Sequence, residues 1–418
     1  MSLKRVFAAF WIFGLVNNVL YVVILSAAVD LVGPKTPKAV VLMADILPSF
    51  ICKLSAPFFI HNIPYNWRIF ILVGLSFIGM LIVSFGGAVS LVICGITLAS
   101  ASSGLGETTF LQLTHYYDEI SLTAWSSGTG GAGLVGSFLF MVMTTWLEVA
   151  PTNALLIFAM VPFVFFIIYF KLLPTPQIPQ QNCLNGSRTD DLEGQEHLLS
   201  QNNSNESSWD HSMTLQPERN KSLFPNKNKE SIWLHLKLTL KRMRAYVLPY
   251  MCPLFSVYVA EYIINQGISP TLLFDIDEMP FHNYRDVYVT YGTLYQLGVF
   301  ISRSSGSFFR IKHLSIPPTL QMINMIICIL QSLFMFIPNI WIIFVLILYE
   351  GLLGGSGYVN TYMNVTEFTQ LEEREFAMGC VSISDSAGIV LAATISMFLE
   401  PALCQYQVKD GRPYCTLH

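Results

Sequence analysis

Three carboxylates, Glu107, Glu261 and Glu350, stand inside long apolar segments of the sequence. A charge at the centre of a bilayer costs about 3 kcal/mol on insertion scales, so such a residue usually faces a polar cavity or a partner of opposite charge. We therefore expect these carboxylates to line a polar pathway between membrane helices, where they bind a substrate or a coupling ion. The alternative is that they pair with lysine or arginine and hold the helix bundle together.

Neutral hydrogen-bonding side chains accompany one of these carboxylates. Tyr262, Asn265 and Gln266 closely follow Glu261 in the sequence. Phenol and amide groups can hold a polyol by hydrogen bonds, so we expect these three residues to contribute to the same cavity.

Two cations, Lys53 and Arg303, stand towards the ends of apolar segments that we predict to be cytosolic. A phosphate ligand would need such groups, and arginine suits it because the planar guanidinium donates two parallel hydrogen bonds. Two alternatives stay open. The side chains extend to the membrane surface, or they form gating ion pairs with Asp45 or Asp385.

A run of small residues contains Gly128, Gly130, Gly131 and Gly133. As a string it matches a dinucleotide-binding fingerprint, but it lacks the preceding strand and the soluble βαβ unit that such a site requires. Small residues let membrane helices approach closely, so we predict that these glycines pack helices together.

The composition indicates a membrane protein. Of the 418 residues, 53% are hydrophobic and 12% are charged, against about 25% charged in soluble proteins, and the mean hydropathy is +0.52. Apolar runs of about 20 residues recur, which is long enough to span a bilayer. We predict an all-α polytopic membrane protein with spans at residues 6–32, 39–60, 67–87, 89–113, 124–147, 152–173, 246–270, 287–306, 316–337, 340–362 and 376–400.

Other function classes lack their usual signatures in the sequence. The net charge is −4 without a clustered basic stretch, so nucleic acid is not an expected partner. The cysteines form no C-x-x-C pair, so we expect no metal site and no cofactor. We find no nucleophile–base pair at a suitable depth, and an enzyme is the least favoured class.

The predicted spans fall into two groups. Residues 1–173 contain six spans and residues 246–400 contain five, with weak similarity at an offset of about 250 residues. Parallel repeats of this kind build major facilitator transporters, which usually have twelve spans, so the count is eleven or twelve. Residues 174–245 form an insert that we expect to be disordered and to end in an amphipathic segment. Lysine and arginine in short loops predict a cytosolic insert and a luminal tail at residues 401–418.

The insert contains a candidate sorting signal. Glu193 precedes the pair Leu198 and Leu199, and the pattern is similar to the acidic dileucine signals that clathrin adaptors bind. The expected partners are therefore clathrin adaptors, the lipid bilayer and a small polar organic substrate.

Seven stretches, taken in order, carry a resemblance to one family: VLMADILP at 41–48, SSGLGE at 102–107, WSSGTGGAG at 125–133, AEYIINQG at 260–267, SRSS at 302–305, LYEGLLGG at 348–355 and REFAM at 374–378. They resemble the battenin family, the lysosomal and endosomal membrane proteins of Batten disease. The resemblance implies an eleven-span, major-facilitator-like protein of the lysosomal or late endosomal membrane that clears glycerophosphodiesters. Older proposals for the family are transport of basic amino acids such as arginine and control of lysosomal pH.

The tail contains Cys404 and Cys415, for which two interpretations exclude each other. Residues 415–418 resemble the family's C-terminal prenylation box, although a terminal histidine is unusual there, and a box requires a cytosolic tail. A luminal tail favours a disulfide between the two cysteines.

Together the residues predict a membrane transporter that works by alternating access. The resemblance implies that it is lysosomal and that it moves a small polar organic anion, with the glycerophosphodiesters as the first candidates. Arg303 and Lys53 would contact the phosphate, and the three buried carboxylates would serve the cavity or ion coupling. The alternative from another class is a membrane scaffold whose central insert recruits trafficking factors.

Overall fold

The computed structural model describes residues 3–27, 38–174, 229–276, 279–281, 284–412 and 415. All regular elements in these residues are helices, which confirms the predicted all-α class. The sorting signal predicted at Glu193, Leu198 and Leu199 lies outside the described residues, as does most of the central insert.

The first six predicted spans correspond to apolar helices, of which the sixth is divided into two. An apolar run forms a helix in a membrane because the helix satisfies all of its backbone hydrogen bonds internally. These helices are α1 (Leu3–Ser26), α3 (Lys38–Phe59), α4 (Tyr65–Phe85), α5 (Val89–Leu113), α6 (Glu119–Met141), and the pair α7 (Pro151–Ala159) and α8 (Val164–Ile167).

The second group of spans follows the insert. Its helices are α9 (Lys229–Tyr246), α10 (Cys252–Ile263), α11 (Tyr284–Ser304), α12 (Ile316–Phe334), α13 (Ile340–Phe368), α14 (Leu371–Val381) and α15 (Ile383–Lys409). Two π-helical turns, Val247–Met251 and Ile264–Ile268, flank α10. Because α9 continues into α10 through the first of these turns, the predicted boundary at residue 246 falls inside one continuous helix.

Ten helical segments of the described residues are long and apolar enough to cross a membrane. The predicted span at residues 287–306 is not among them, because α11 includes polar residues such as Gln296 and Arg303. This helix nevertheless has 21 residues, or about 31 Å at 1.5 Å per residue. It packs against α6 and α13 and exposes Leu297 and Ile301. Gln296 and Arg303 therefore face α6, whereas Leu297 and Ile301 lie on the outer surface of the bundle.

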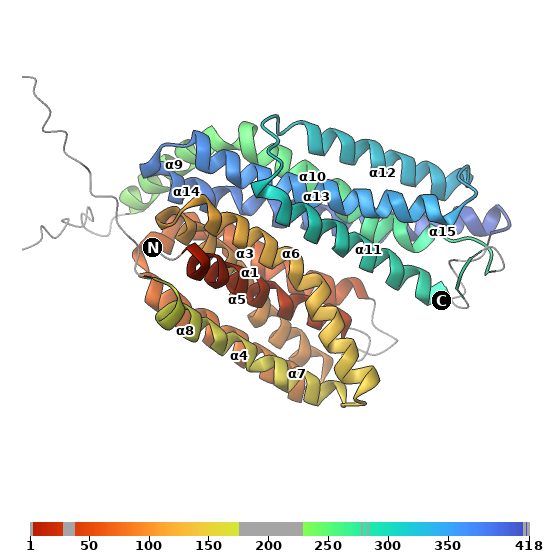
Figure 1. The fold of residues 1–418 in the computed structure, drawn as a ribbon, viewed down its shortest axis with the longest axis horizontal. Coiled ribbons are helices and arrows are strands. Elements are labelled where there is room, and N and C mark those ends of the chain that lie inside the picture. Colours follow the sequence, from red (N-terminus) through yellow and green to blue (C-terminus); the bar gives the residue numbers. More distant parts are fainter. Residues whose placement is uncertain are drawn as a thin grey trace, which may run out of the picture. The chain divides into compact units, whose positions relative to one another are not determined.

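Helix packing brings the two groups of spans into contact (Figure 1). In the first group α1 packs on α6, and α5 packs on α3 and α4; in the second, α11 packs on α13 and α10 on α15. Between the groups, α6 contacts α11 and α3 contacts α15. One buried core includes Phe13, Phe110 and Trp125 from the first group together with Tyr258 and Tyr358 from the second. These contacts between groups position the candidate site.

Candidate functional site

A buried ion-pair cluster joins three helices through Lys53. The Lys53 Nζ atom of α3 lies 2.6 Å from Glu107 Oε2 of α5 and 3.1 Å from Asp385 Oδ1 of α15. The Lys53 side chain is only 2% exposed, so it does not extend to the membrane surface. Of the alternatives open from the sequence, the structure contains the ion pair with Asp385. Contact between Lys53 and a phosphate would require breaking these pairs.

Arg303 of α11 occupies a different environment, in which its hydrogen-bonding partners are neutral. Its Nη1 atom donates to Thr129 Oγ1 of α6 at 2.7 Å, and its Nη2 atom donates to the Tyr258 hydroxyl of α10 at 2.8 Å. The guanidinium also lies 4.1 Å above the ring centroid of Tyr358, a cation–π contact. The Nε atom has no hydrogen-bond partner among the described residues. The Nε–H group of Arg303 is therefore still available to donate a hydrogen bond to an anion.

Tyr358 links these two charged centres. Its hydroxyl accepts a hydrogen bond from Trp125 Nε1 at 3.1 Å and donates to Glu107 Oε1 at 3.3 Å, while its ring faces Arg303. Tyr358 of α13 is thus in contact with both the Arg303 site and the Lys53 cluster.

Glu261 and Glu350 form a second pair of buried acids, on α10 and α13. Their exposed fractions are 2% and 0%. The Tyr295 hydroxyl of α11 donates to Glu261 Oε1, and Asn265 Nδ2 donates to Glu350 Oε1 at 2.7 Å. The Oε2 atoms of both acids have no hydrogen-bond partner within the described part of the chain. Neither acid forms a salt bridge in that part. For Glu261 and Glu350 the structure therefore does not contain the ion pairs of the alternative interpretation.

The other predicted cavity residues lie beside these acids. The ring of Tyr262 stacks on Tyr258, with centroids 6.1 Å apart, which brings Tyr262 next to the partner of Arg303. Asn265 and Gln266 lie in the π-helical turn Ile264–Ile268, and both are half-buried. The predicted role of all three in holding a polyol stays a prediction.

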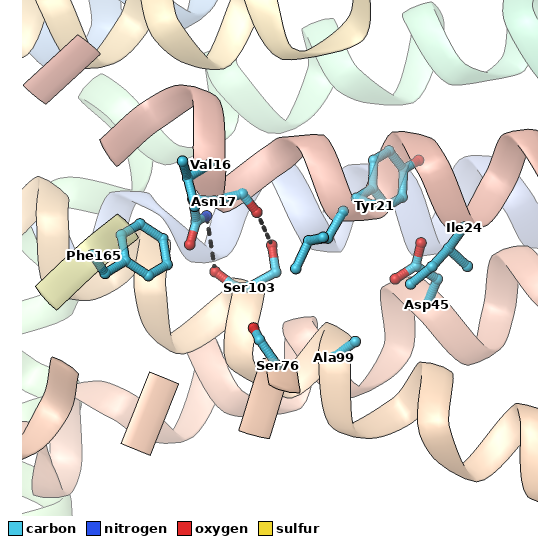
Figure 2. Close-up of a pocket in the computed structure, with 10 residues that line it drawn as sticks. Val16, Asn17, Tyr21, Ile24, Asp45, Ser76, Ala99, Ser103 and Phe165 are labelled. Atoms are coloured by element: carbon cyan, nitrogen blue, oxygen red, sulfur yellow. Dashed lines mark hydrogen bonds between the residues drawn. The ribbon is translucent and has the colours of Figure 1, made fainter. Parts of the chain in front are cut away.

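Asp45 is not part of the Lys53 cluster. It is 3% exposed and lines a separate small cavity between α1, α3, α4, α5 and α8 (Figure 2). No ion pair of Asp45 occurs among the described residues. Of the two acids predicted as partners of Lys53, only Asp385 contacts it, and the gating role stays a prediction.

The four predicted packing glycines lie on α6 at its contacts with two helices. A Cβ atom at Gly128 would overlap the carbonyl oxygen of Trp11 on α1. At Gly130 it would lie 3.2 Å from the Arg303 Cδ atom, at Gly131 3.4 Å from the Phe300 ring, and at Gly133 inside the Gln296 amide, all on α11. The lack of side chains here lets Arg303 reach Thr129.

In the tail, Cys404 and Cys415 are joined by a disulfide, with their Cα atoms 5.8 Å apart. Of the two interpretations of Cys415, the structure therefore contains the disulfide. Residues 416–418 of the alternative prenylation box lie outside the described residues.

Sequence reasoning missed three residues of the site: Thr129, Tyr295 and Tyr358. Each is a hydroxyl-bearing residue inside an apolar segment. This is the one feature by which the sequence could have pointed to them, but such residues are frequent in this chain. What distinguishes these three is contact with Arg303 or Glu261 from another helix, and that depends on packing.

The family model of the CLN3 protein matches residues 8–406 of the chain. Among relatives, the protein BTN1 of Yarrowia lipolytica is 55% identical over 412 residues, covering 99% of this chain and 98% of the relative. The protein BTN1 of Saccharomyces cerevisiae is 48% identical over 428 residues, covering 99% and 98%.

Among solved structures, the human organic anion transporter MFSD10 (TETRAN) matches with a TM-score of 0.61 and 9% identity, covering 100% of both chains. The major facilitator superfamily transporter FucP in its outward conformation matches with a TM-score of 0.58 and 11% identity, covering 99% of this chain and 97% of that one. At these identities the likeness concerns the fold, which is that of major facilitator transporters.

Proposed function

The chain belongs to the CLN3 protein family, and from this premise, with its major-facilitator-like fold, we propose that it exports glycerophosphodiesters or a similar small polar organic anion by alternating access. The proposal includes a lysosomal and late endosomal location, a role in lysosomal pH homeostasis, and clathrin adaptors as partners of the central insert. These finer points are supported by the resemblance of the seven sequence stretches.

The observation that carries the proposal is that the side chains bonded directly to Arg303 are neutral. Lys53 is neutralised by two carboxylates, whereas no carboxylate of the described residues forms a salt bridge with Arg303. A cation without a direct ion pair at membrane depth is costly, and a bound anion would lower that cost. A phosphodiester has one negative charge and two non-bridging oxygens, which match the parallel N–H groups of a guanidinium.

Groups suited to the rest of such a substrate begin at Tyr258, which contacts Arg303, and continue along α10. Tyr258 and Tyr262 present phenol groups from α10, and Asn265 and Gln266 follow one turn later. Phenol and amide groups bind hydroxyls, so the glycerol moiety would lie along α10 while Arg303 of α11 binds the phosphate. A substrate held in this way would contact Arg303 and Tyr258 from one group of spans and Thr129 from the other.

The proposal is tested by uptake of labelled glycerophosphodiester into liposomes that contain the purified protein, with arginine and a nucleoside as comparison substrates. We expect saturable uptake of the phosphodiester alone. Arg303→Gln should lower the uptake rate at least tenfold, because loss of a charge-assisted hydrogen bond costs about 1.5–3 kcal/mol. Arg303→Lys should be intermediate, since it keeps the charge and loses the planar fork.

Arg244→Gln is the matched control, because it removes the same charge from an exposed position in α9. Its uptake rate should equal that of the unmodified protein. Unchanged uptake by folded Arg303→Gln would remove Arg303 from the proposal, and uptake of arginine in place of the phosphodiester would refute the substrate class.

A further inference from the structure

The two buried acids Glu261 and Glu350 meet where α10 crosses α13. A Cβ atom at Gly354, one turn after Glu350, would overlap the Glu261 carboxyl group. One turn after Glu261, Asn265 Nδ2 donates to Glu350 Oε1 at 2.7 Å. The two helices run antiparallel at this crossing, so each acid lies against the other helix within one turn of its counterpart.

Gln321 of α12 faces the same crossing. Two contacts fix the register of α12 against α13: Pro317 Cβ lies 3.6 Å from the position of a Cβ atom at Gly357, and Asn324 Nδ2 donates to the Leu346 carbonyl at 3.4 Å. Gln321 lies between the two contacting residues of α12 and on the same face of that helix. Glu350 lies between the two contacting residues of α13, again on the same face. The register therefore places Gln321 opposite Glu350.

The Gln321 side chain has unused hydrogen-bonding capacity at this point. It is 0% exposed, and neither its Nε2 nor its Oε1 atom has a hydrogen-bond partner within the described part of the chain. Buried polar groups are normally hydrogen-bonded. An amide both donates and accepts, so it can donate to a carboxylate and accept from a carboxylic acid. Gln321 thus suits a neighbouring acid that gains and loses a proton.

The charged and titratable groups around the two acids come from several helices. They are Tyr262 on α10, Tyr295 and Arg303 on α11, Cys328 on α12 and, against Tyr262, Asp385 on α15. Arg303 acts on Glu261, whereas the charge that acts on Glu350 is that of Glu261, which has the same sign. Asp385 is bonded to Lys53. Two ionised acids would therefore leave negative charge uncompensated at membrane depth, which is costly.

We propose that Glu350, with Glu261 and Gln321, forms a proton-binding site that couples transport of the anion to movement of a proton. The donors around the acids favour a proton over a metal ion. The Asn265 amide and the Tyr295 hydroxyl both donate into the site, whereas hard metal cations take oxygen lone pairs as ligands. A carboxyl group that binds a proton needs no further ligands.

The proton site adjoins the anion site through α13. A Cβ atom at Gly355 would lie 3.1 Å from Arg303 Cγ, and the preceding residue, Gly354, lies against the Glu261 carboxyl group. One proton and one phosphodiester have no net charge together, so the pair crosses the membrane more easily than the anion alone. This coupling rests on the proposed function, whereas proton binding by the two acids does not.

The coupling is tested by uptake of labelled glycerophosphodiester into liposomes that contain the full-length protein, with and without a pH gradient that is acidic on the substrate side. We expect the gradient to raise the initial rate of the unmodified protein and to have no effect on Glu350→Gln or Glu261→Gln. Glu372→Gln, the same change at an exposed position of α14, should keep the response. Gln321→Leu should reduce the response about fivefold, as expected for one lost hydrogen bond, whereas Met322→Leu on the exposed face of α12 should not.

Proton binding itself is measured by pH-dependent infrared difference spectra of the purified protein. The C=O band of a protonated buried carboxyl group should be lost in Glu350→Gln and shifted in Gln321→Leu, which keeps both acids and covers the case that Glu350→Gln does not fold. The proposal is overturned if uptake ignores the pH gradient, or if folded Glu350→Gln and Glu261→Gln both keep the response and the band. Uptake that ignores the gradient would leave the proposed function standing, and the expected band changes without any anion uptake would support the proton site and refute the proposed function.

Discussion

At the scale of single residues, the Lys53 cluster is asymmetric, because two carboxylates share one ammonium group. Loss of the base leaves two acids buried side by side without a counter-ion. Loss of one acid leaves one lysine paired with one carboxylate. The two kinds of substitution should therefore differ in how strongly they lower stability, although both break an ion pair.

We expect Lys53→Met to destabilise the protein by about 3–5 kcal/mol, the usual cost of removing one partner of a buried ion pair. Asp385→Asn should change stability by less than about 1 kcal/mol, because Lys53 keeps Glu107 and an amide can still accept a hydrogen bond. Melting temperatures and the yield of monodisperse protein measure both effects. Equal loss in the two variants would show that the charges do not interact as described.

At the scale of helices, the glycines of α6 determine how closely it approaches its neighbours. A Cβ at Gly128 would overlap the Trp11 carbonyl oxygen and lie 3.1 Å from the Leu15 amide nitrogen. Both contacts are with the backbone of α1, which cannot move away as a flexible side chain can. The contact between α1 and α6 therefore depends on a hydrogen atom at this position.

Gly128→Ala should destabilise the protein by about 1–3 kcal/mol, the usual cost of overpacking. Gly74→Ala in α4 is the matched control, because nothing lies within 4 Å of the added Cβ atom. It should be neutral or slightly stabilising, since alanine favours a helix over glycine by up to about 1 kcal/mol. Thermal unfolding of the two variants tests the difference, and a stable Gly128→Ala protein would contradict the close approach.

At the scale of the whole molecule, bonds between the two groups of spans gather at the end that charge distribution predicts to be cytosolic. Arg310 Nη2 lies 2.8 Å from Glu119 Oε2, and Ser127 Oγ lies 2.9 Å from Ser304 Oγ. The hydroxyl of Tyr65 also donates to Glu375 Oε1 at 2.6 Å. In alternating access these contacts must separate when the pathway opens towards that end.

Paired cysteines at Ser127 and Ser304, introduced into a variant without other free cysteines, should lock this end. Oxidation should link the two cysteines and stop uptake of the transported substrate, and a reducing agent should restore it. Each single cysteine variant serves as the control and should be insensitive to oxidation. Continued transport by the fully cross-linked protein would mean that α6 and α11 do not separate during the cycle.

Sequence reasoning located the buried acids but could not pair them. Glu107, Glu261 and Glu350 are all buried, as predicted, and residues 89–113 coincide with α5, because apolar runs determine burial and helix limits locally. The partner of Lys53 is different, since Asp385 lies 332 residues away and Asp45 was equally compatible with the sequence. Packing also decides details within helices: the Ser100 hydroxyl of α5 accepts a hydrogen bond from the Ser49 amide of α3 and donates to the Asp45 carbonyl.

The Lys53 cluster also bears on the order in which the protein is assembled during translation. Lys53 and Glu107 leave the ribosome early and can neutralise each other as soon as α3 and α5 are in the membrane. Asp385 is synthesised much later and enters with α15, where its partner is already present. The Lys53–Glu107 pair can therefore form within the first six spans, and Asp385 joins it when α15 packs against α3.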